Sequence, residues 1–228
     1  MRTSPSGIAI LPTSTCTTRH NTGGWLFAGL LWLLAPLAAA DELMPRIPLQ
    51  DPWQPVLDAL AEQYPERDRS RVVIVSIGEQ RLHYFLDAKL MRSYRVSTSR
   101  YGIGSEAGSN RTPLGVHRVR RKIGADAPLG TIFKARRDTG EIAEIVREPR
   151  ITGDDYVTTR ILWLDGMEEG VNRGEGVDSF SRYIYLHGTH EEGLIGQPAS
   201  HGCVRMYNRD VVELFDALPE DALVVIVE

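Results

Sequence analysis

The chain has 228 residues, of which 42% are hydrophobic and 25% charged, and its formal net charge is −4 at pH 7. This is the composition of an ordinary globular domain, and the length suits one domain with an appended leader better than two full domains. The only dense basic stretch is 117–122, where the alternating Arg118 and Arg120 are typical of the solvent-facing side of a strand. Because polyanion binding needs clustered cations on a basic surface, we expect no nucleic-acid partner.

An apolar run near the N-terminus predicts export. Residues 25–37 are almost all apolar, too short a run for a ~20-residue membrane span, and an Ala-Ala-Ala sequence follows at 38–40. We interpret 1–40 as a secretory signal peptide that is cleaved after its last alanine, with a retained membrane anchor as the alternative. The expected location is periplasmic. Removal of Arg2 and Arg19 leaves 24 basic against 30 acidic residues, a net charge of −6.

Residues 41–70 predict a tail that contains one short helix. Prolines are scattered through the first part, and apolar residues at helical spacing follow at 56–61 before Pro65 ends the pattern. From Arg71 onward the apolar period changes to that of strands.

The remaining sequence predicts a mainly β domain over residues 71–228. The expected strands are 72–77, 81–86, 94–97, 115–120, 131–135, 156–164, 183–186 and 223–227. A run at 209–218 has apolar residues at helical spacing and is the only helix expected in the second half. We therefore expect a sandwich-like or closed β-sheet with one or two packed helices. The charged, glycine-rich segment 153–182 is expected to be a solvated connection or a lid.

The two cysteines point to thiol chemistry. Loss of the leader removes Cys16 and leaves Cys203 alone, so no intramolecular disulfide can form. A solitary thiol in an oxidising compartment is easier to understand if the thiol itself is used. A thiol with a pKa of ~8.5 normally needs a nearby imidazole or positive charge to react at neutral pH. His187, at the end of the apolar run 183–186, is the candidate base.

Two short segments carry a resemblance to a known family. Ser200-His201-Gly202-Cys203-Val204-Arg205 places the cysteine 16 positions after His187, and Arg111-Thr112-Pro113-Leu114-Gly115 forms a turn further upstream. Together they resemble the L,D-transpeptidase (YkuD-like) catalytic domain of bacterial cell-wall enzymes, over about residues 71–228. The resemblance implies a β-rich sandwich capped by helices and an exported peptidoglycan L,D-transpeptidase.

The expected chemistry assigns a role to each residue of the dyad. Cys203 attacks a carbonyl and forms a thioester, which divides one acyl transfer into two easier steps. His187 holds the thiolate as an ion pair and carries protons to the leaving amine and from the incoming one. The resemblance implies that the main-chain carbonyl of Gly188 orients the imidazole.

The residues next to the cysteine are expected to bind substrate. Gly202 permits a tight turn that points its own amide and that of Cys203 at the developing oxyanion. Arg205 offers a planar guanidinium to a substrate carboxylate. Ser200 and His201 are expected to shape this loop rather than to transfer protons.

The resemblance also implies the partners. These are peptidoglycan stem peptides as donors, an amine of a second stem, a D-amino acid or an outer-membrane lipoprotein lysine as acceptor, and carbapenems as inhibitors. No metal or other cofactor is expected. Two alternatives stay open: a hydrolase with the same dyad, acting as an L,D-carboxypeptidase or an amidase, and a non-catalytic wall-binding or zinc-binding module. In the zinc alternative the ligands are His187, His190, His201 and Cys203.

Overall fold

The computed structural model describes residues 51–228. The expected signal peptide, 1–40, and the first part of the tail lie outside these residues. The described part of the chain contains ten strands, two α-helices and one short 3-10 helix, so the predicted mainly β fold with one or two packed helices is confirmed. Among residues 51–228, no helix combines the length and the apolar character that a membrane span requires.

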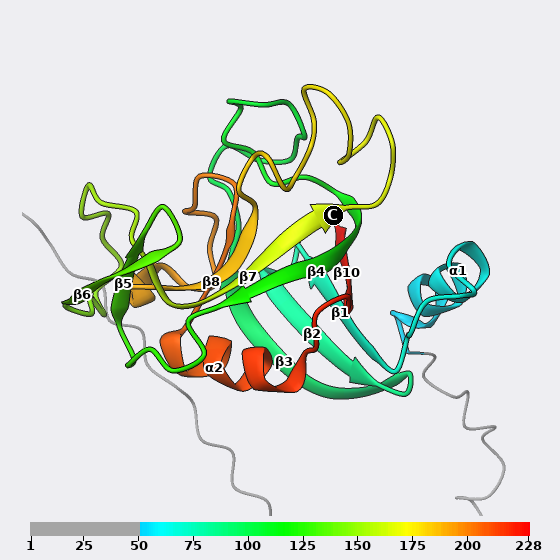
Figure 1. Cartoon of the computed structure of the whole chain (residues 1–228), viewed down its shortest axis with the longest axis horizontal. Coiled ribbons are helices and arrows are strands. Elements are labelled where there is room, and N and C mark those ends of the chain that lie inside the picture. The colour runs from blue at the N-terminus through cyan, green and yellow to red at the C-terminus, as the bar shows by residue number, and fades with distance from the viewer. Residues whose placement is uncertain (1–50) are drawn as a thin grey trace, which may run out of the picture. The chain divides into compact units, whose positions relative to one another are not determined.

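The strands belong to one strongly curved sheet. In chain order the elements are α1 (Gln54–Gln63), β1 (Arg71–Ser76), β2 (Arg81–Leu86), β3 (Lys89–Ser97), β4 (Gly115–Ile123), β5 (Thr131–Lys134), β6 (Arg137–Ile142), β7 (Val157–Gly166), β8 (Tyr185–Thr189), η1 (Glu192–Leu194), β9 (Val204–Met206), α2 (Asn208–Ala217) and β10 (Leu223–Val227). The strand order is β4-β10-β1-β2-β3-β9-β8-β7-β5-β6, and a further pairing of β4 with β7 closes the sheet on itself. β5 and β6 remain outside this ring as an arm (Figure 1).

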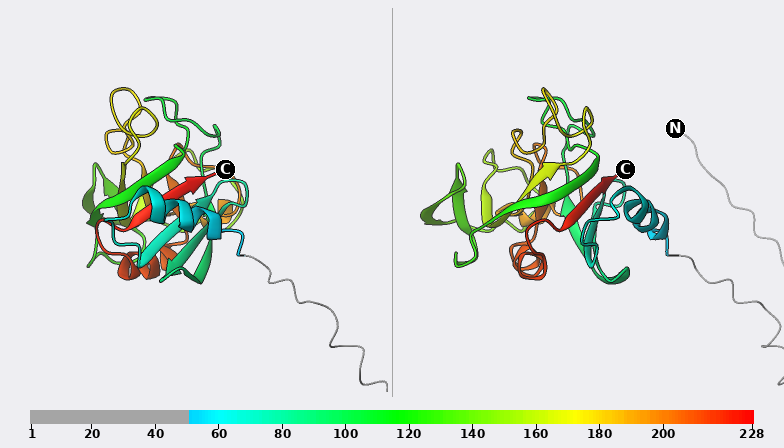
Figure 2. Two further views of the ribbon diagram at one scale, coloured as in Figure 1. Left: turned by 90° about the vertical axis from the view of Figure 1, so that its right-hand side faces the viewer. Right: turned by 45° about the vertical axis from the view of Figure 1, so that its right-hand side comes forward.

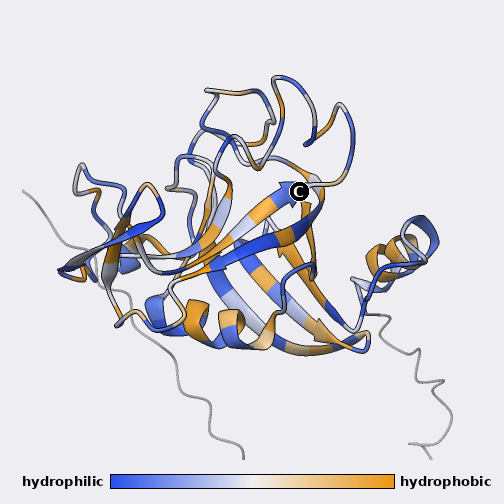
Figure 3. Cartoon of the chain, in the orientation of Figure 1, coloured by the Kyte–Doolittle hydropathy of each residue, from blue (hydrophilic) through white to orange (hydrophobic). Residues whose placement is uncertain are grey.

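Alternation along the strands of the ring separates two cores. On β1, Val73 and Val75 point into the interior core, which also receives the apolar face of α2. Their neighbours Val72 and Ile74 point outward and are covered by α1. Figure 2 shows α1 lying over the outside of the sheet, and Figure 3 shows apolar residues concentrated in the ring while the β5–β6 arm is largely hydrophilic. Burial on both sides explains the almost unbroken apolar run of β1.

The same alternation places the candidate site. β8 and β9 pair in parallel, with Leu186 beside Val204 and His187 beside Arg205. Leu186, Val204 and Met206 are fully buried in the interior core. Because successive side chains point to opposite faces of a strand, the residues between them face away from this core. The outward face therefore carries Tyr185, His187, Arg205 and, just before β9, Cys203.

The charged segment expected at 153–182 is more ordered than a solvated connection. β7 occupies its first half, and the rest is anchored by Asn172, which is fully buried. The Asn172 side-chain amide donates to the carbonyls of Leu114 (3.0 Å) and Val116 (3.1 Å), and its oxygen accepts the Glu168 N–H (3.0 Å). The turn that ends at Leu114 is thus tied to this connection.

Candidate active site

Cys203 lies between the end of a loop and the start of β9, and it is half-buried. It packs against a cluster on the outward face that contains Phe133, Ile161, Trp163 and Tyr185. Its thiol donates to the carbonyl oxygen of Tyr183 at 3.2 Å. Burial raises the pKa of the Cys203 thiol to about 12, and the charge of Asp155 acts in the same direction. The sulfur is therefore protonated at neutral pH.

His187 is almost fully buried, and a single contact fixes its tautomer. Its Nδ1 lies 2.7 Å from the carbonyl oxygen of Gly188. A carbonyl only accepts hydrogen bonds, so Nδ1 carries the proton and Nε2 keeps a lone pair. Burial lowers the pKa of the His187 imidazole to about 4. Burial therefore favours the neutral form of both groups over the expected thiolate–imidazolium ion pair, because the ring lies inside the fold without solvent to stabilise its charge.

The loop before Cys203 is held by its own hydrogen bonds. Ser200 Oγ donates to the carbonyl of Cys203 at 2.6 Å and accepts the N–H of Gly202 at 3.2 Å. Thr112 Oγ1 donates to the carbonyl of Gly202 at 3.0 Å, which joins the upstream turn to this loop. Gly202 has φ +118°, a conformation that side chains rarely adopt. The Gly202 amide, expected to face an oxyanion, thus has an acceptor within the loop.

Arg205 is placed differently from its expected role. Its side chain is 1% exposed, with Nη1 2.9 Å from Glu191 Oε2 and Nη2 2.5 Å from Asp155 Oδ1. Two carboxylates that are distant in sequence thus each pair with one terminal nitrogen of the guanidinium, whereas the buried Nε has no hydrogen-bond partner among residues 51–228. Arg205 therefore joins protein segments, and its side chain is closed to solvent.

His201 also makes contacts that the sequence did not reveal. Its Nδ1 lies 2.6 Å from Asp155 Oδ2 and its Nε2 lies 2.6 Å from Arg100 Nη2. An arginine only donates, so Nε2 accepts and the Nδ1–H donates to the carboxylate. Asp155 comes just before β7 and far from Cys203 in sequence, and no motif marks it.

The four possible zinc ligands do not converge. His187 contacts the Gly188 carbonyl, His201 contacts Asp155, and Cys203 contacts the Tyr183 carbonyl. His190 Nε2 lies 2.8 Å from Thr152 Oγ1. Across residues 51–228, no three His, Cys, Asp or Glu side chains are arranged as a metal-ligand set.

A cavity of about 370 Å³ borders the cluster around Cys203. It shares Ile123, Ala127 and Phe133 with that cluster, and Arg136 lies on its rim. The Arg136 guanidinium is 4.6 Å from the ring centroid of Tyr183. Arg136 sits in the two-residue β5–β6 turn and has φ +64°. The turn lacks the Asn-Gly or Asp-Gly pair that usually marks this geometry, so it could not be predicted from the sequence.

A family model described as the L,D-transpeptidase catalytic domain, YkuD, matches residues 70–226. The chain therefore belongs to the YkuD family of L,D-transpeptidase catalytic domains, and the resemblance drawn from the sequence is confirmed.

Curated relatives and solved structures extend this comparison. The chain is similar to the YkuD protein of Bacillus subtilis (43% identity over 49 residues; 21% of this chain and 30% of the relative) and to that of Bacillus licheniformis (48% over 42 residues; 18% and 26%). The matches thus span less than a third of these relatives. An L,D-transpeptidase of Xylanimonas cellulosilytica has 22% identity, covers 75% of this chain and 68% of its own, and has a TM-score of 0.42. L,D-transpeptidase 3 of Mycobacterium tuberculosis, in complex with a faropenem-derived adduct, has 17% identity, coverages of 70% and 60%, and a TM-score of 0.43.

Proposed function

We propose that this chain is an exported peptidoglycan L,D-transpeptidase that uses Cys203 as its nucleophile and acts in the periplasm after removal of residues 1–40. Membership of the YkuD family supports the reaction class. The observation that carries the assignment of residues is the contact of His187 Nδ1 with the Gly188 carbonyl at 2.7 Å. This contact leaves Nε2 as the proton acceptor on the sheet face that also carries Cys203.

In the first half-reaction the Cys203 sulfur attacks the carbonyl carbon at the L-centre of diaminopimelate in a tetrapeptide stem. The thiol proton passes to Nε2 of His187 as the sulfur–carbon bond forms. The carbon–nitrogen bond to the terminal D-residue then breaks, and its amine leaves with that proton. A histidine whose pKa burial lowers to about 4 becomes a strong acid once protonated, which favours proton delivery to the leaving amine.

In the second half-reaction an amine attacks the thioester carbonyl and gives its proton to Nε2. The carbon–sulfur bond then breaks, and Nε2 returns that proton to the sulfur, which restores the thiol. The proposed acceptors are the amine of a second stem, a D-amino acid or a lipoprotein lysine. A carbapenem acylates the same sulfur, since opening of its strained lactam follows the same sequence of bond changes. The Arg136 guanidinium, 4.6 Å from the Tyr183 ring, and that of Arg182, whose charge acts on the thiol, suit an anionic stem.

The test is incubation of the purified protein with disaccharide-tetrapeptide from a Gram-negative wall, with Cys203→Ala as the control and products identified by mass. A dimer that lacks one terminal D-alanine is the expected product. Tripeptide monomer alone identifies a hydrolase instead. No product from the intact protein contradicts stem chemistry, and stoichiometric zinc that is lost in Cys203→Ala identifies a zinc-binding module.

A further inference from the structure

One carboxylate joins the two flanks of the thiol. Asp155 Oδ2 lies 2.6 Å from His201 Nδ1, and Asp155 Oδ1 lies 2.5 Å from Arg205 Nη2. His201 comes two residues before Cys203 and Arg205 two residues after it. Asp155 itself comes from the segment that leads into β7, so it ties the nucleophile segment to a third part of the fold.

We propose that Asp155 is a positioning residue for acyl transfer, which clamps the segment around Cys203 and presents a negative charge to the His187 side of the site. This goes beyond the proposed function and rests on it only for the identity of Cys203 as the nucleophile.

The clamp is built on buried charge. Arg205 pairs with Glu191 at 2.9 Å as well as with Asp155, and Glu191 is 2% exposed. Glu191 also accepts the N–H of Thr152 at 2.6 Å and its hydroxyl at 2.8 Å. The segment before β7 is thus fixed at two points, Thr152 and Asp155. Removal of either carboxylate leaves a buried guanidinium short of a partner, which is costly.

The charges that face Asp155 come from every neighbouring element. The neutral imidazole of His187, with His190 and Glu191, comes from the β8 side, and Arg205 comes from β9. His201 comes from the nucleophile loop, and Arg100 lies on its far side, 2.6 Å from Nε2. Arg205 has two carboxylate partners, Asp155 and Glu191, whereas Arg100 reaches Asp155 only through the His201 ring. The negative charge that acts on both reacting groups is that of Asp155.

This charge has a defined sign of effect on both reacting groups. Burial opposes ionisation of Asp155, but the charge of Arg205 and the hydrogen bond from His201 lower the pKa of its carboxyl. The ionised carboxylate raises the pKa of His187, against the larger lowering that burial causes, and adds to the burial that raises the pKa of the Cys203 thiol. The imidazole is thereby a better base, while the sulfur keeps its proton until a substrate carbonyl arrives.

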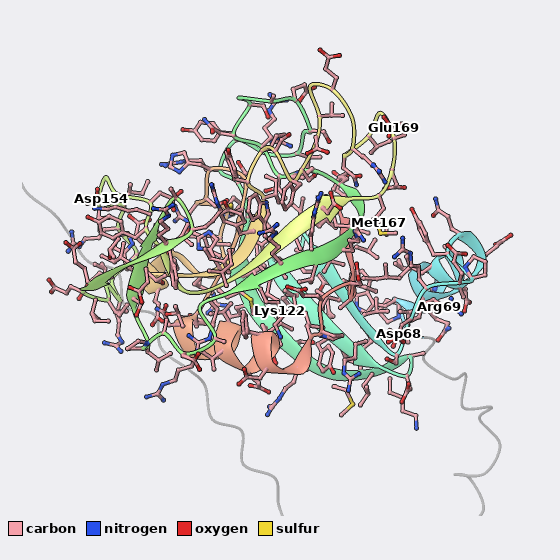
Figure 4. All side chains as sticks on the ribbon, viewed as in Figure 1. Asp68, Arg69, Lys122, Asp154, Met167 and Glu169 are labelled. Atoms are coloured by element: carbon pink, nitrogen blue, oxygen red, sulfur yellow. The ribbon has the colours of Figure 1, made fainter. Side chains whose placement is uncertain are left out.

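The experiment compares Asp155→Asn with Asp154→Asn in the full chain. Asparagine keeps the shape of the side chain and removes its charge. Asp154 is the adjacent acidic residue at the edge of the domain (Figure 4), so its substitution removes the same charge from the same turn without touching the clamp. Asp155→Glu restores the charge. The rates of acylation by a carbapenem and of alkylation by iodoacetamide are measured across pH, on the peptide that carries Cys203 so that Cys16 does not contribute.

In Asp155→Asn we expect the plateau rate of acylation to fall at least about tenfold, because small displacements of reacting groups cost up to about 10² in rate. The acid limb of the acylation profile, which reports His187, moves to lower pH, and the alkaline limb of alkylation, which reports the thiol, also moves to lower pH. Asp155→Glu recovers part of the rate, and Asp154→Asn behaves as the wild type.

Loss of structure alone gives a different result. A loosened, hydrated site moves the acid limb upward, toward the ordinary histidine pKa of about 6.5. That outcome, or identical profiles for Asp155→Asn and Asp154→Asn, overturns the proposal. If Asp155→Asn does not fold, His201→Ala, which removes the donor of one arm of the clamp and keeps the Asp155 charge, must slow acylation without moving the acid limb. Acylation by a carbapenem and alkylation by iodoacetamide need only the thiol and no stem peptide. If Asp155→Asn shifts these pH profiles in a protein that does not crosslink stems, the result contradicts the proposed function and not this inference.

Discussion

The two faces of the β8–β9 pair are one residue apart in sequence and differ in polarity and in the kind of interaction that holds their side chains. Inward, Leu186, Val204 and Met206 are fully buried among apolar side chains. Outward, His187 and Arg205 are equally buried but are polar, and each depends on one or two specific partners. The inward face stabilises the fold through non-directional burial, whereas the outward face holds groups at defined angles.

This difference shows how a small domain separates stability from chemistry. The apolar face tolerates changes of shape within limits set by packing, but it fixes the register of both strands. A slip of one residue would exchange the two faces and send the thiol into the core. Substitutions on the two faces should therefore have separable effects.

The largest effect is expected on the outward face. Cys203→Ala should abolish acylation, and His187→Gln should reduce its rate by about 10³-fold or more, since loss of either member of such a pair disables the unit. The thermal midpoint of Cys203→Ala should stay close to that of the wild type, because the sulfur is only half-buried. Mass measurement of the carbapenem adduct, with its position located by peptide mapping, checks this, and an adduct outside Cys16 on Cys203→Ala would disprove the assigned nucleophile.

On the inward face, Leu186→Ala should leave a cavity and lower the free energy of unfolding by about 2–5 kcal/mol. Leu186 is fully buried and its neighbours belong to several strands, so they cannot collapse freely into the space. Urea unfolding measures the loss. The acylation rate per folded molecule should remain within a few-fold of the wild-type rate. A large loss of rate at unchanged stability would show that the two faces are not separable.

Two buried histidines give a smaller, pH-dependent effect. Burial lowers the pKa of His117 and of His187 to about 4, whereas an unfolded chain titrates near 6.5. As the pH falls, the unfolded state therefore binds protons before the folded state does. The free energy of unfolding is thus at its full value above pH 6.5 and decreases as the pH falls toward 4. Each histidine contributes up to about 1.4 kcal/mol per pH unit in that window.

His117 and His187 can be distinguished by what else changes. His117 is fully buried and contacts Ser179 Oγ at 2.9 Å. His117→Gln should flatten the dependence of the urea midpoint on pH and leave acylation intact, whereas His187→Gln should alter both. If neither variant flattens the profile, other groups dominate acid unfolding.

Much of the ring was predictable because alternation is a local property of the sequence. The runs that form β1, β2 and β10 are apolar enough to mark their own boundaries. Two strands were missed for opposite reasons. β6 is exposed along its whole length, so no apolar pattern marks it. β9 has only three residues, and they follow Cys203 in a motif that was interpreted as a catalytic site and not as a strand.

The pairing between strands that are distant in the chain could not be predicted from the sequence. The parallel pairs β1–β10 and β8–β9 and the closure of β4 onto β7 depend on three-dimensional packing that no local pattern encodes. The candidate site likewise has one part that could be predicted from local sequence and one part that depends on the fold. Cys203, His187 and the Gly188 carbonyl lie within one short stretch of sequence, whereas Asp155 and Glu191 reach Arg205 only through the fold. A guanidinium next to a nucleophile suggested substrate binding because its two partners were not visible.

The smallest expected effect tests whether the β5–β6 arm belongs to the site at all. Arg136 contacts the rings of Tyr183 and Trp163 and has no role in the clamp or the core. Arg136→Ala should raise the KM for tetrapeptide about two- to fivefold and leave kcat unchanged, because a partly exposed cationic contact contributes about 0.5–1 kcal/mol. Arg137→Ala removes the same charge from the next, exposed position and should leave KM unchanged. Equal effects of both substitutions would mean that the arm attracts the stem only through its net charge, and a fall in kcat would mean that Arg136 also orders the aromatic residues beside the thiol.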